Sequence, residues 1–310
     1  MDLSIIILNW NTKDFLRNCL RSLEECAISY KKEIIVVDNA STDDSVAMVK
    51  KNFPSVKIIQ NKENTGFAKG NNIGIKQSSG RYVCIVNSDV TIRRECFNQL
   101  IQHMDTHPTI GIIGPTIFWP DLTVQGTCRK FPGLWNNFCE HFYLNRLFPK
   151  YSFFSGEHMF PSFDHKTTKN VDCLVGCFLM IRKKTLEDVG LFDEQFFIYS
   201  EEIDLCKRFW KKGWVVKFFP TDGAIHHGRA SSSKDPQRFS MEQQISVLKY
   251  WKKHRNRFDV AVFLLMLVVS HGLRLAFGSF LYFISPSRRE KTVQQISKHQ
   301  ACLKFILFAR

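Results

Sequence analysis

Over the first 118 residues, short runs of aliphatic residues alternate with stretches of helical periodicity. The apolar runs predict strands at Leu3–Leu8, Glu33–Val37, Val56–Gln60, Arg81–Val86 and Ile110–Phe118. Apolar residues at helical spacing predict helices over 15–23, Asp43–Phe53 and Arg93–Met104. Continuous apolar strands separated by helices indicate an α/β fold with a parallel sheet that is covered on both faces.

Periodicity weakens over residues 119–170, which are rich in Phe, Trp, Pro and His. We expect this stretch to be a long excursion that covers or helps to build a pocket. Regular patterns then predict a strand within Val171–Ile181, helices at Lys184–Val189 and Glu202–Lys212, and a strand at Trp214–Phe219. A loop at 231–236 follows, so we expect one domain over residues 1–235 and a helical extension over 236–310.

The predicted extension combines a basic helix, Met241–Arg257, with an apolar segment, Val260–Ile284. Spanning a bilayer takes about 20 apolar residues. The segment contains His271, Gly272 and Arg274, and an arginine near the centre of a span costs roughly 2.5–3.5 kcal/mol. We therefore favour one or two helices that lie in the membrane interface over a spanning helix. A helical hairpin packed on the main domain is the alternative.

Charge strengthens the membrane interpretation. The formal net charge is +14, and residues 238–310 hold 13 Lys and Arg against three Asp and Glu. A basic flank around an apolar stretch favours anionic lipid over nucleic acid as the partner. The ten cysteines are scattered, and polar residues begin soon after the first strand, so we expect reduced thiols, no secretory signal peptide and a cytoplasmic location.

Polar residues follow the predicted strands at Asn9, Asn11, Asp38 and Asp89. The carboxyl ends of parallel strands form the ligand-binding edge of an α/β sheet. Asp38 is a candidate for a carboxylate that accepts hydrogen bonds from the base or ribose of a nucleotide. It could instead cap the next helix, but the 41–43 segment offers other caps.

The segment Asn64–Asn72 places glycines and Lys69 near a predicted helix start, where backbone N–H groups can approach phosphates. The chain has no Gly-Lys-Ser/Thr loop, and no GxGxxG follows its first strand. These absences count against P-loop nucleotidases and dinucleotide dehydrogenases.

Asp89 is the candidate ligand for Mg²⁺ or Mn²⁺, which are held by one or two carboxylates together with substrate phosphates. The alternative is a turn residue at the end of a strand. His226, which we expect in a loop after a strand, is a second candidate metal or phosphate ligand, and Arg229 is a candidate for neutralising phosphate charge. A structural histidine is the alternative.

The cluster Glu201-Glu202-Ile203-Asp204 opens a predicted helix. Acidic residues are ordinarily favourable in a first helical turn. Three carboxylates within four residues exceed that need, and crowding raises their proton affinity, which suits a general base.

Taken together, these segments resemble the inverting family 2 glycosyltransferases, in particular a rhamnosyltransferase-like subgroup. The matching segments run in order from about residue 3 to 231: 5–11, 37–41, 64–72, 87–89, 190–194 and 199–208. The resemblance implies a GT-A fold, with a mixed, mainly parallel sheet flanked by helices.

The resemblance also implies roles. Glu202 would be the catalytic base, although the family usually has Asp there, with Glu201 and Asp204 as alternatives. Asp89 would be the last residue of the DxD-type metal motif, in which Asn87 replaces the first aspartate, and His226 would be the later metal or phosphate contact. Gly176, Cys177, Glu201 and Asp204 would lie on the acceptor side. We expect the nucleotide-sugar-binding residues to be Asn9, Asn11, Asp38, Asn39, Asn64, Gly66, Lys69, Asn72 and Asn87.

The implied reaction is metal-assisted, inverting transfer of a sugar from a nucleoside-diphosphate donor, with a lean toward deoxythymidine-diphosphate rhamnose or a uridine-diphosphate sugar. The expected acceptor is a hydroxyl of a saccharide or lipid-linked saccharide at the inner face of the cytoplasmic membrane. One alternative is a non-catalytic sugar-nucleotide-binding or scaffold protein of the same fold. A nucleotidyltransferase is disfavoured, because residues 9–12 stand where its glycine-rich signature would be.

Overall fold

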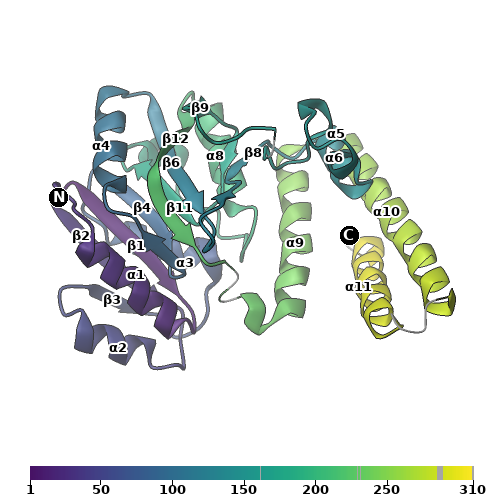
Figure 1. Ribbon diagram of the computed structural model, residues 1–310, viewed down its shortest axis with the longest axis horizontal. Coiled ribbons are helices and arrows are strands. Elements are labelled where there is room, and N and C mark those ends of the chain that lie inside the picture. The colour runs from purple at the N-terminus through teal and green to yellow at the C-terminus, as the bar shows by residue number, and fades with distance from the viewer. Residues whose placement is uncertain (161, 229, 231, 285–288, 309–310) are drawn as a thin grey trace. The chain divides into compact units, whose positions relative to one another are not determined.

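The computed structural model describes residues 1–160, 162–228, 230, 232–284 and 289–308 (Figure 1). The chain divides into two compact units. The first comprises residues 1–131 and 158–246, and the second comprises residues 132–157 and 247–310.

A mixed sheet forms the centre of the first unit (Figure 1). Within the described residues its main path has the strand order β3-β2-β1-β4-β11-β6-β12-β5, while β7 pairs with β6 and β9 pairs with β12. The strands are β1 Leu3–Asn9, β2 Lys32–Asp38, β3 Lys57–Gln60, β4 Tyr82–Asn87, β5 Val90–Ile92, β6 Ile110–Phe118, β7 Val124–Gln125, β9 Lys169–Asn170, β11 Phe178–Arg182 and β12 Val215–His226. A separate small antiparallel pair joins β8 Cys128–Arg129 to β10 Cys173–Leu174.

Strand direction confirms the mixed, mainly parallel sheet that the resemblance implied. β3, β2, β1 and β4 are mutually parallel, whereas β11 runs antiparallel to both β4 and β6. The apolar pattern alone indicated a parallel sheet, because a buried run does not specify strand direction. The expected strand within Val171–Ile181 is divided into β10 and β11, with 175–177 between them.

Helices cover both faces of the sheet in the first unit. They are α1 Lys13–Glu25, α2 Ser45–Asn52, α3 Gly66–Lys76, α4 Cys96–Thr106, α7 Thr185–Val189 and α8 Glu201–Lys211. Alternate residues of β1 face opposite sides: Ile5 and Ile7 share a core with α1 and α4, whereas Ile6 lies against Gly74 of α3. A Cβ at Gly74 would lie 2.5 Å from Ile6, so glycine permits the close approach of α3 to the sheet.

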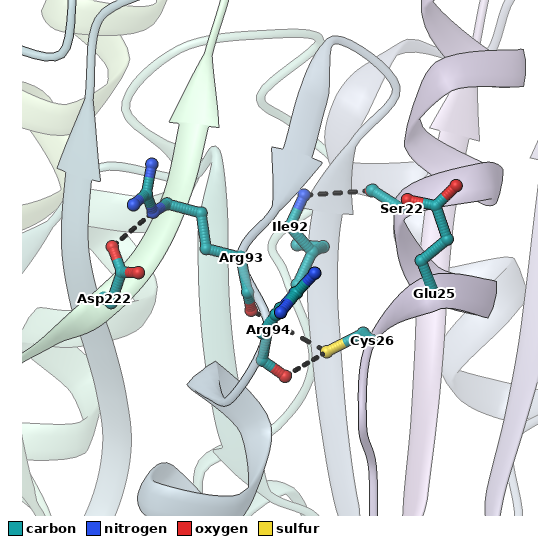
Figure 2. Close-up of a pocket in the computed structure, with 7 residues that line it drawn as sticks. All are labelled: Ser22, Glu25, Cys26, Ile92, Arg93, Arg94 and Asp222. Atoms are coloured by element: carbon teal, nitrogen blue, oxygen red, sulfur yellow. Dashed lines mark hydrogen bonds and ion pairs between the residues drawn. The ribbon is translucent and has the colours of Figure 1, made fainter.

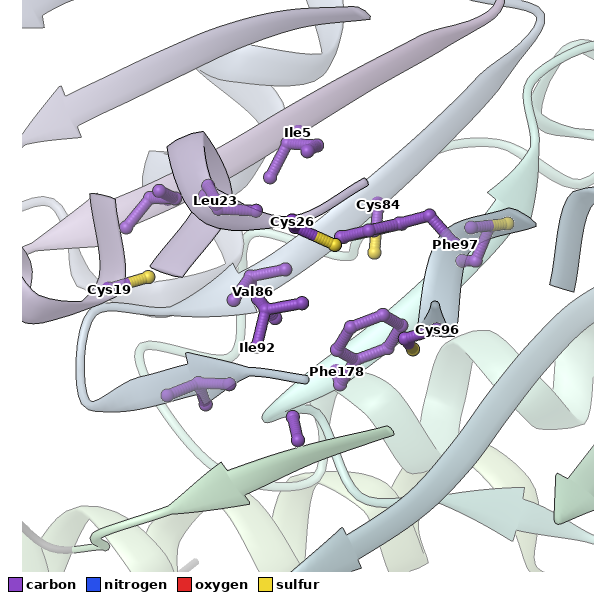
Figure 3. Packing of buried hydrophobic residues seen from close by; sticks show 14 of the residues in the cluster. Ile5, Cys19, Leu23, Cys26, Cys84, Val86, Ile92, Cys96, Phe97 and Phe178 are labelled. Carbon is purple, nitrogen blue, oxygen red and sulfur yellow. The ribbon is translucent and has the colours of Figure 1, made fainter. Parts of the chain in front are cut away.

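The core on the α1 and α4 side joins the parallel strands to β11 (Figure 3). Phe97 of α4 is fully buried, and the centroid of its ring lies 5.5 Å from that of Phe178 on β11. All ten cysteines are buried and free, and several belong to this core.

Helix α9, Pro236–His254, crosses the boundary between the units. Its first part belongs to the first unit, because Ser246 donates to the carbonyl of Ile198 and Phe239 lies 6.0 Å from Trp10 between ring centroids. The predicted boundary between 235 and 236 therefore differs from the division into compact units, which also assigns residues 132–157 to the second unit.

The second unit is helical. It contains α5 Leu134–His141, α6 Leu144–Leu147, the 3-10 turn η1 Ser152–Phe154, the C-terminal end of α9, α10 Arg257–Ile284 and α11 Arg289–Phe308. The apolar segment is thus a single helix, and α11, which the sequence pattern did not predict, packs beside it. Residues 257–282 of α10 are long and apolar enough to cross a membrane, judged by length and composition.

Truncating Phe97 tests the importance of the shared core. We expect Phe97→Ala to lower the free energy of unfolding by about 3–5 kcal/mol, the usual cost of deleting a buried phenyl ring. Phe15→Ala, at a ring that is 37% exposed on the same side of the sheet, should cost within about 1 kcal/mol. Guanidinium denaturation measures both, and equal losses would contradict this description of the core.

Candidate active site

The register of the parallel strands brings three predicted site residues to one edge of the sheet. Asn9 lies opposite Asp38, and Leu8 lies opposite Asn87. All three side chains thus stand at the carboxyl ends of β1, β2 and β4, as the strand pattern predicted.

Asp38 is held by its neighbours at this edge. Its carboxylate accepts hydrogen bonds from the amide of Asn9 at 2.9 Å and from the backbone N–H of Ser41 at 2.8 Å, and the residue is 2% exposed. Asn11, which has a φ of 54°, accepts from the backbone N–H of Thr42. Asp38 and Asn11 therefore fix the loops that follow β1 and β2, and direct contact of Asp38 with a nucleoside stays a prediction.

The start of α3 is joined to the same edge through Asn39. Its amide donates to the side chain of Asn64 at 3.2 Å and to the carbonyl of Gly66 at 3.1 Å. Gly66 has a φ of 81°, and a Cβ there would lie 2.4 Å from the carbonyl oxygen of Phe197. Lys69 is exposed on α3. Glycine is thus required where this helix approaches the segment that precedes α8.

The side chain of Asn72 is bound to residues 192 and 194, which follow α7. Its amide donates to the carbonyl of Phe192 at 2.8 Å and to the carboxylate of Glu194 at 3.0 Å, and its oxygen accepts from the N–H of Phe192. A buried amide with these partners fastens α3 to residues 192–194. Its expected contact with the nucleotide sugar stays a prediction.

Asp89 and His226 meet beyond the end of β4. The Nε2 atom of His226 lies 3.3 Å from Oδ1 of Asp89, and both residues are nearly buried. Burial acts to raise the pKa of Asp89, but the hydrogen bond and charge of His226, together with the N–H of Ala230, hold it below its usual value. Asp89 is therefore an anionic oxygen donor at neutral pH.

His226 is the last residue of β12, so the expectation that it lies in a loop after a strand is wrong. The strand extends beyond Phe219 because residues 224–226 pair with β5. This antiparallel pairing aligns His226 with Val90, the neighbour of Asp89. Arg229 lies outside the described residues.

The donor set fits a divalent cation that takes its other ligands from a substrate. Nδ1 of His226 lies 3.1 Å from Oε1 of Gln125 and can donate to it, so a metal could take the place of the Nε2 proton that faces Asp89. An imidazole nitrogen and a carboxylate oxygen suit a metal between them. Within the described ranges, no group of three or more His, Cys, Asp or Glu side chains is arranged to hold a metal. Asp89 and His226 would therefore need further ligands, such as phosphate oxygens.

The acidic cluster opens α8 after an unusual turn. Tyr199 and Ser200 both have a left-handed backbone, with φ of 68° and 67°. Such conformations are unfavourable for residues with a side chain and persist where the surrounding structure requires them. The turn directs Glu201 and Glu202 inward, so that they are 4% and 6% exposed.

Arg129 provides the positive charge beside Glu202. Its Nη1 lies 3.8 Å from Oε1 of Glu202, and its Nη2 donates to Nε2 of His158 at 2.9 Å. Burial and the charge of Arg129 lower the pKa of His158 to about 4, so the imidazole remains a neutral acceptor. Burial raises the pKa of Glu202, while Arg129 acts in the opposite direction.

Glu201 has a different environment. Burial and the charge of Glu202 raise its pKa well above the usual value, so that Glu201 is the protonated member of the pair. Each of the two carboxyl groups has a buried Oε2 atom without a hydrogen-bond partner. Such atoms are costly to bury, and a ligand hydroxyl would satisfy them.

Asp204 is anchored by Arg208. It is fully buried and accepts from Nε of Arg208 at 2.9 Å, and the same guanidinium donates to the carbonyls of Val189 and Leu191. This arrangement fastens α8 to the loop after α7. The structure therefore leaves Glu201 and Glu202 as the better placed carboxylates, and acceptor binding by Asp204 stays a prediction.

Gly176 and Cys177 connect the two halves of the site. A Cβ at Gly176 would lie 3.6 Å from Cβ of Glu202, and the carbonyl of Cys177 accepts from the N–H of Asn87 at 3.0 Å. Burial raises the pKa of the Cys177 thiol to about 12, and the charges of Asp89 and Glu202 both add to the shift. The charges of Asp89 and Glu202 thus both act on Cys177, although the two residues are far apart in the chain.

A surface pocket of about 440 Å³ lies elsewhere in this unit (Figure 2). It is lined by the C-terminal end of α1 and the residues after β5, and Arg93 forms an ion pair with Asp222 beside it. None of the predicted site residues lines it. We therefore place no part of the site there.

Three neighbours of the site were not predicted from the sequence. Arg129 and Gln125 lie in the weakly periodic stretch, and Trp119 stacks on His226 with ring centroids 6.5 Å apart. Arg129 follows Cys128 in a two-residue strand, which is too short to leave a periodic signal.

Comparison with known proteins gives a consistent result. A family profile described as "Glycosyl transferase family 2" matches residues 4–190, more than half of the chain. An N-acetylglucosaminyl-diphospho-decaprenol L-rhamnosyltransferase of Mycobacterium tuberculosis is 27% identical over 248 residues, which cover 76% of this chain and 78% of that protein. The low-salt glycan biosynthesis hexosyltransferase Agl10 of Haloferax volcanii is 27% identical over 83% of this chain and 74% of its own length.

Solved structures share the fold. The mannosyltransferase PcManGT of Pyrobaculum calidifontis, in complex with GDP-Man and Mn²⁺, matches with a TM-score of 0.58 and 15% identity over 99% of this chain and 87% of its own. GalNAc-T7 with UDP, GalNAc and Mn²⁺ matches with a TM-score of 0.57 and 16% identity, over 73% of this chain and 44% of its own. These likenesses confirm the GT-A fold.

The protonation of Glu201 predicts a pH-dependent stability. The pKa of Glu201 is raised in the folded state. Its contribution to the free energy of unfolding is therefore fully present below the usual carboxyl pKa and is lost as the pH rises through the pKa of the folded state. Glu201→Gln removes this loss. The free energy of unfolding of the variant should therefore rise relative to that of wild type as the pH increases from about 5 to about 8.

Urea denaturation across this pH range measures the difference. Glu187→Gln, at an exposed carboxylate of α7, is the matched control and should leave the pH dependence of stability unchanged. A parallel pH dependence in Glu201→Gln and wild type would show that Glu201 ionises normally in the folded protein.

Proposed function

This chain belongs to glycosyltransferase family 2, and we propose that it transfers a sugar from a nucleoside-diphosphate sugar to a hydroxyl of a lipid-linked saccharide, with inversion of the anomeric configuration. The observation that carries the proposal is the position of the segment Gly176-Cys177, which lies against Glu202 at Gly176 and is affected by the charges of both Asp89 and Glu202 at Cys177. A negatively charged leaving group and an acceptor hydroxyl need two different groups at one place. Asp89 with His226 serves the first, and Glu202 serves the second.

Glu202 acts as the general base. Its ionised carboxylate accepts the proton of the acceptor hydroxyl while that oxygen forms a bond to the anomeric carbon. The bond between the anomeric carbon and the diphosphate oxygen breaks, and the nucleoside diphosphate leaves with the electron pair. A single displacement inverts the anomeric carbon, and no covalent enzyme intermediate is formed.

Arg129 and Glu201 both influence the ionisation of the proposed base, Glu202. The guanidinium lies 3.8 Å from Glu202 and favours its ionised form, whereas a protonated Glu201 adds no second negative charge. A base buried in the first turn of α8 would otherwise hold its proton too strongly at neutral pH. Arg129 is therefore a positioning residue for Glu202.

The proposed cofactor of this reaction is Mg²⁺ or Mn²⁺, as the sequence suggested. Asp89 and His226 would hold it, and when bound it would supply positive charge beside the departing diphosphate. The two neighbouring folds described above were crystallised with Mn²⁺. Asn87, in place of the first acidic residue of the metal motif, contributes no charge.

The names of the relatives support a proposal for the donor and the acceptor. One relative is named as a rhamnosyltransferase that acts on a diphospho-decaprenol-linked N-acetylglucosamine. We propose deoxythymidine-diphosphate rhamnose or a uridine-diphosphate sugar as donor, in the synthesis of a cell-surface polysaccharide. A lipid-linked acceptor is consistent with the apolar helix α10 and the basic C-terminal quarter, so we place the protein at the inner face of the cytoplasmic membrane.

Replacing the base tests the mechanism. Glu202→Gln keeps the size and hydrogen-bonding capacity of the side chain but cannot accept the proton. We expect the rate of sugar transfer to fall by about 10²–10⁴-fold, the usual contribution of general base catalysis. The affinity for nucleoside diphosphate, measured by calorimetry, should stay within about twofold of wild type, since it depends on a different part of the site.

A donor screen is the control for this experiment. Wild-type protein should slowly release nucleoside diphosphate and free sugar from one or more nucleotide sugars even without acceptor, because water can take the place of the acceptor hydroxyl. Binding without any release by wild type would instead favour the non-catalytic alternative. Near-normal transfer by Glu202→Gln would remove Glu202 as the base.

The metal site gives a separate prediction. Asp89→Asn and His226→Ala should each weaken Mn²⁺ binding in the presence of a nucleoside diphosphate by about tenfold or more, because each removes one of two proposed protein ligands. The neighbouring His227→Ala, whose ring faces Phe15 and Thr91, is the matched control. Electron paramagnetic resonance of free Mn²⁺ measures all three, and equal affinities would exclude this metal site.

A further inference from the structure

Helix α10 exposes a long row of large apolar side chains, which is unusual for a helix in water. Its most exposed large side chains are apolar: Phe258 74%, Leu265 63%, Val269 44%, Leu273 58%, Phe277 62%, Phe280 58% and Ile284 58%. Successive members lie three, four or seven residues apart, so they form one continuous stripe along the helix. We call these seven residues the α10 stripe.

Two polar side chains in the middle of α10 are buried inside the second unit. Ser270 and His271 are 2% and 5% exposed. Nδ1 of His271 lies 2.9 Å from Nδ1 of His299 on α11, and Arg274 donates to the carbonyl of His141 on α5 at 2.8 Å. Polar groups thus take part in the contacts between helices, beside the buried Phe263, Met266 and Leu267, while a second apolar face of α10 points outward. This is the pattern of protein segments whose solvent is lipid.

The neighbour of α10 prevents the helix from crossing the bilayer alone. His271 contacts His299, and a Cβ at Gly278 would lie 3.2 Å from Ile296, so α11 packs antiparallel along the second half of α10. Lys298 and Lys304 are exposed on α11. A transmembrane α10 would carry these ammonium groups into the hydrocarbon, which is costly.

An orientation in the plane of the membrane satisfies both helices. The α10 stripe then enters the boundary between headgroups and acyl chains, and the lysines of α11 remain at the level of the phosphates. The exposed aromatic side chains of residues 135–153 in the same unit, Trp135, Tyr151 and Phe153, are of the kind found at membrane interfaces.

We propose that the second unit binds an anionic phospholipid surface monotopically, with α10 lying in the plane of the membrane and the α10 stripe as its lipid contact. This inference deepens the membrane association offered under Proposed function. It selects one of three arrangements that the sequence left open: a spanning helix, an interfacial helix and a buried hairpin.

Spin labels on the full chain separate these arrangements. We would introduce Leu265→Cys, Leu273→Cys and Phe280→Cys one at a time, at exposed positions, while the ten native cysteines are buried. Vesicles of phosphatidylcholine and phosphatidylglycerol are added, and the accessibility of each label to oxygen and to a polar nickel complex gives its depth. We expect three similar, shallow depths.

Each other result overturns the proposal. A label at 273 that is deepest, with 265 and 280 nearer the two surfaces, would show a spanning helix. Labels that gain no oxygen accessibility on addition of vesicles would show that α10 does not contact lipid.

Paired variants test the contribution of the stripe to affinity. Leu265→Ser with Leu273→Ser should reduce vesicle binding by about tenfold or more, because interfacial binding scales with buried apolar area. Leu122→Ser with Val293→Ser removes two aliphatic side chains of similar exposure outside the stripe and is the matched control. Equal losses for the two pairs would contradict a specific role for the stripe.

Release of nucleoside diphosphate from nucleotide sugars is measured on the same proteins in vesicle-free buffer, as a test of the active site that does not depend on the membrane. We expect both pairs to retain this release, because none of the four replaced residues belongs to the proposed catalytic, nucleotide-binding or metal-binding residues. Absence of release in wild type and variants alike would defeat the proposed function and leave the depth measurements valid. Normal release with unchanged vesicle binding would defeat only the monotopic contact.

Discussion

The antiparallel pairing of β11 with β4 is the constraint on which the site depends. Phe178 lies opposite Val86, so the residues just before β11 stand beside the residues just after β4. That pairing brings Cys177 next to Asn87, whose N–H donates to its carbonyl, two residues before Asp89. Since Gly176 also lies against Glu202, the same register brings the first turn of α8 to the carboxyl ends of the parallel strands.

Buried charge is the second organising feature. Three carboxyl groups are each less than a tenth exposed: Asp89, Glu201 and Glu202. The interactions that decide whether each group is ionised differ among the three. His226 and a backbone amide stabilise the ionised form of Asp89, whereas Arg129 opposes the effect of burial on Glu202. For Glu201, burial and the charge of Glu202 outweigh the effect of Arg129 and raise its pKa well above the usual value. Two adjacent carboxyl groups with different proton affinities are a usual basis for dividing acid and base roles.

Much of this arrangement could be predicted from the sequence, because strand ends leave a local signal. An apolar run followed by Asn9, Asp38 or Asn87 identifies the edge of the sheet without knowledge of the fold. The convergence of Glu202 with Asp89 was available only through the resemblance to a family, because it depends on pairing between distant strands. Arg129 was missed, since it lies in a short strand within an aromatic stretch that lacks periodicity.

Two further differences have physical reasons. The long β12 carries His226 into the sheet because β5 supplies a partner for residues 224–226, and β5 is only three residues long. The orientation of α10 was also hidden, because the composition of an apolar helix does not reveal which of its faces a neighbour covers. The contacts of His271 and Arg274 supply that information.

The most direct test of the central claim is a crystal structure with Mn²⁺ and an intact or slowly reacting nucleotide sugar, with the metal located by anomalous scattering. We expect the Mn²⁺ peak between Asp89, His226 and the diphosphate, with the anomeric carbon on the side of Glu202. A donor and metal bound away from Asp89, or an anomeric carbon turned away from Glu202, would contradict the proposed active site.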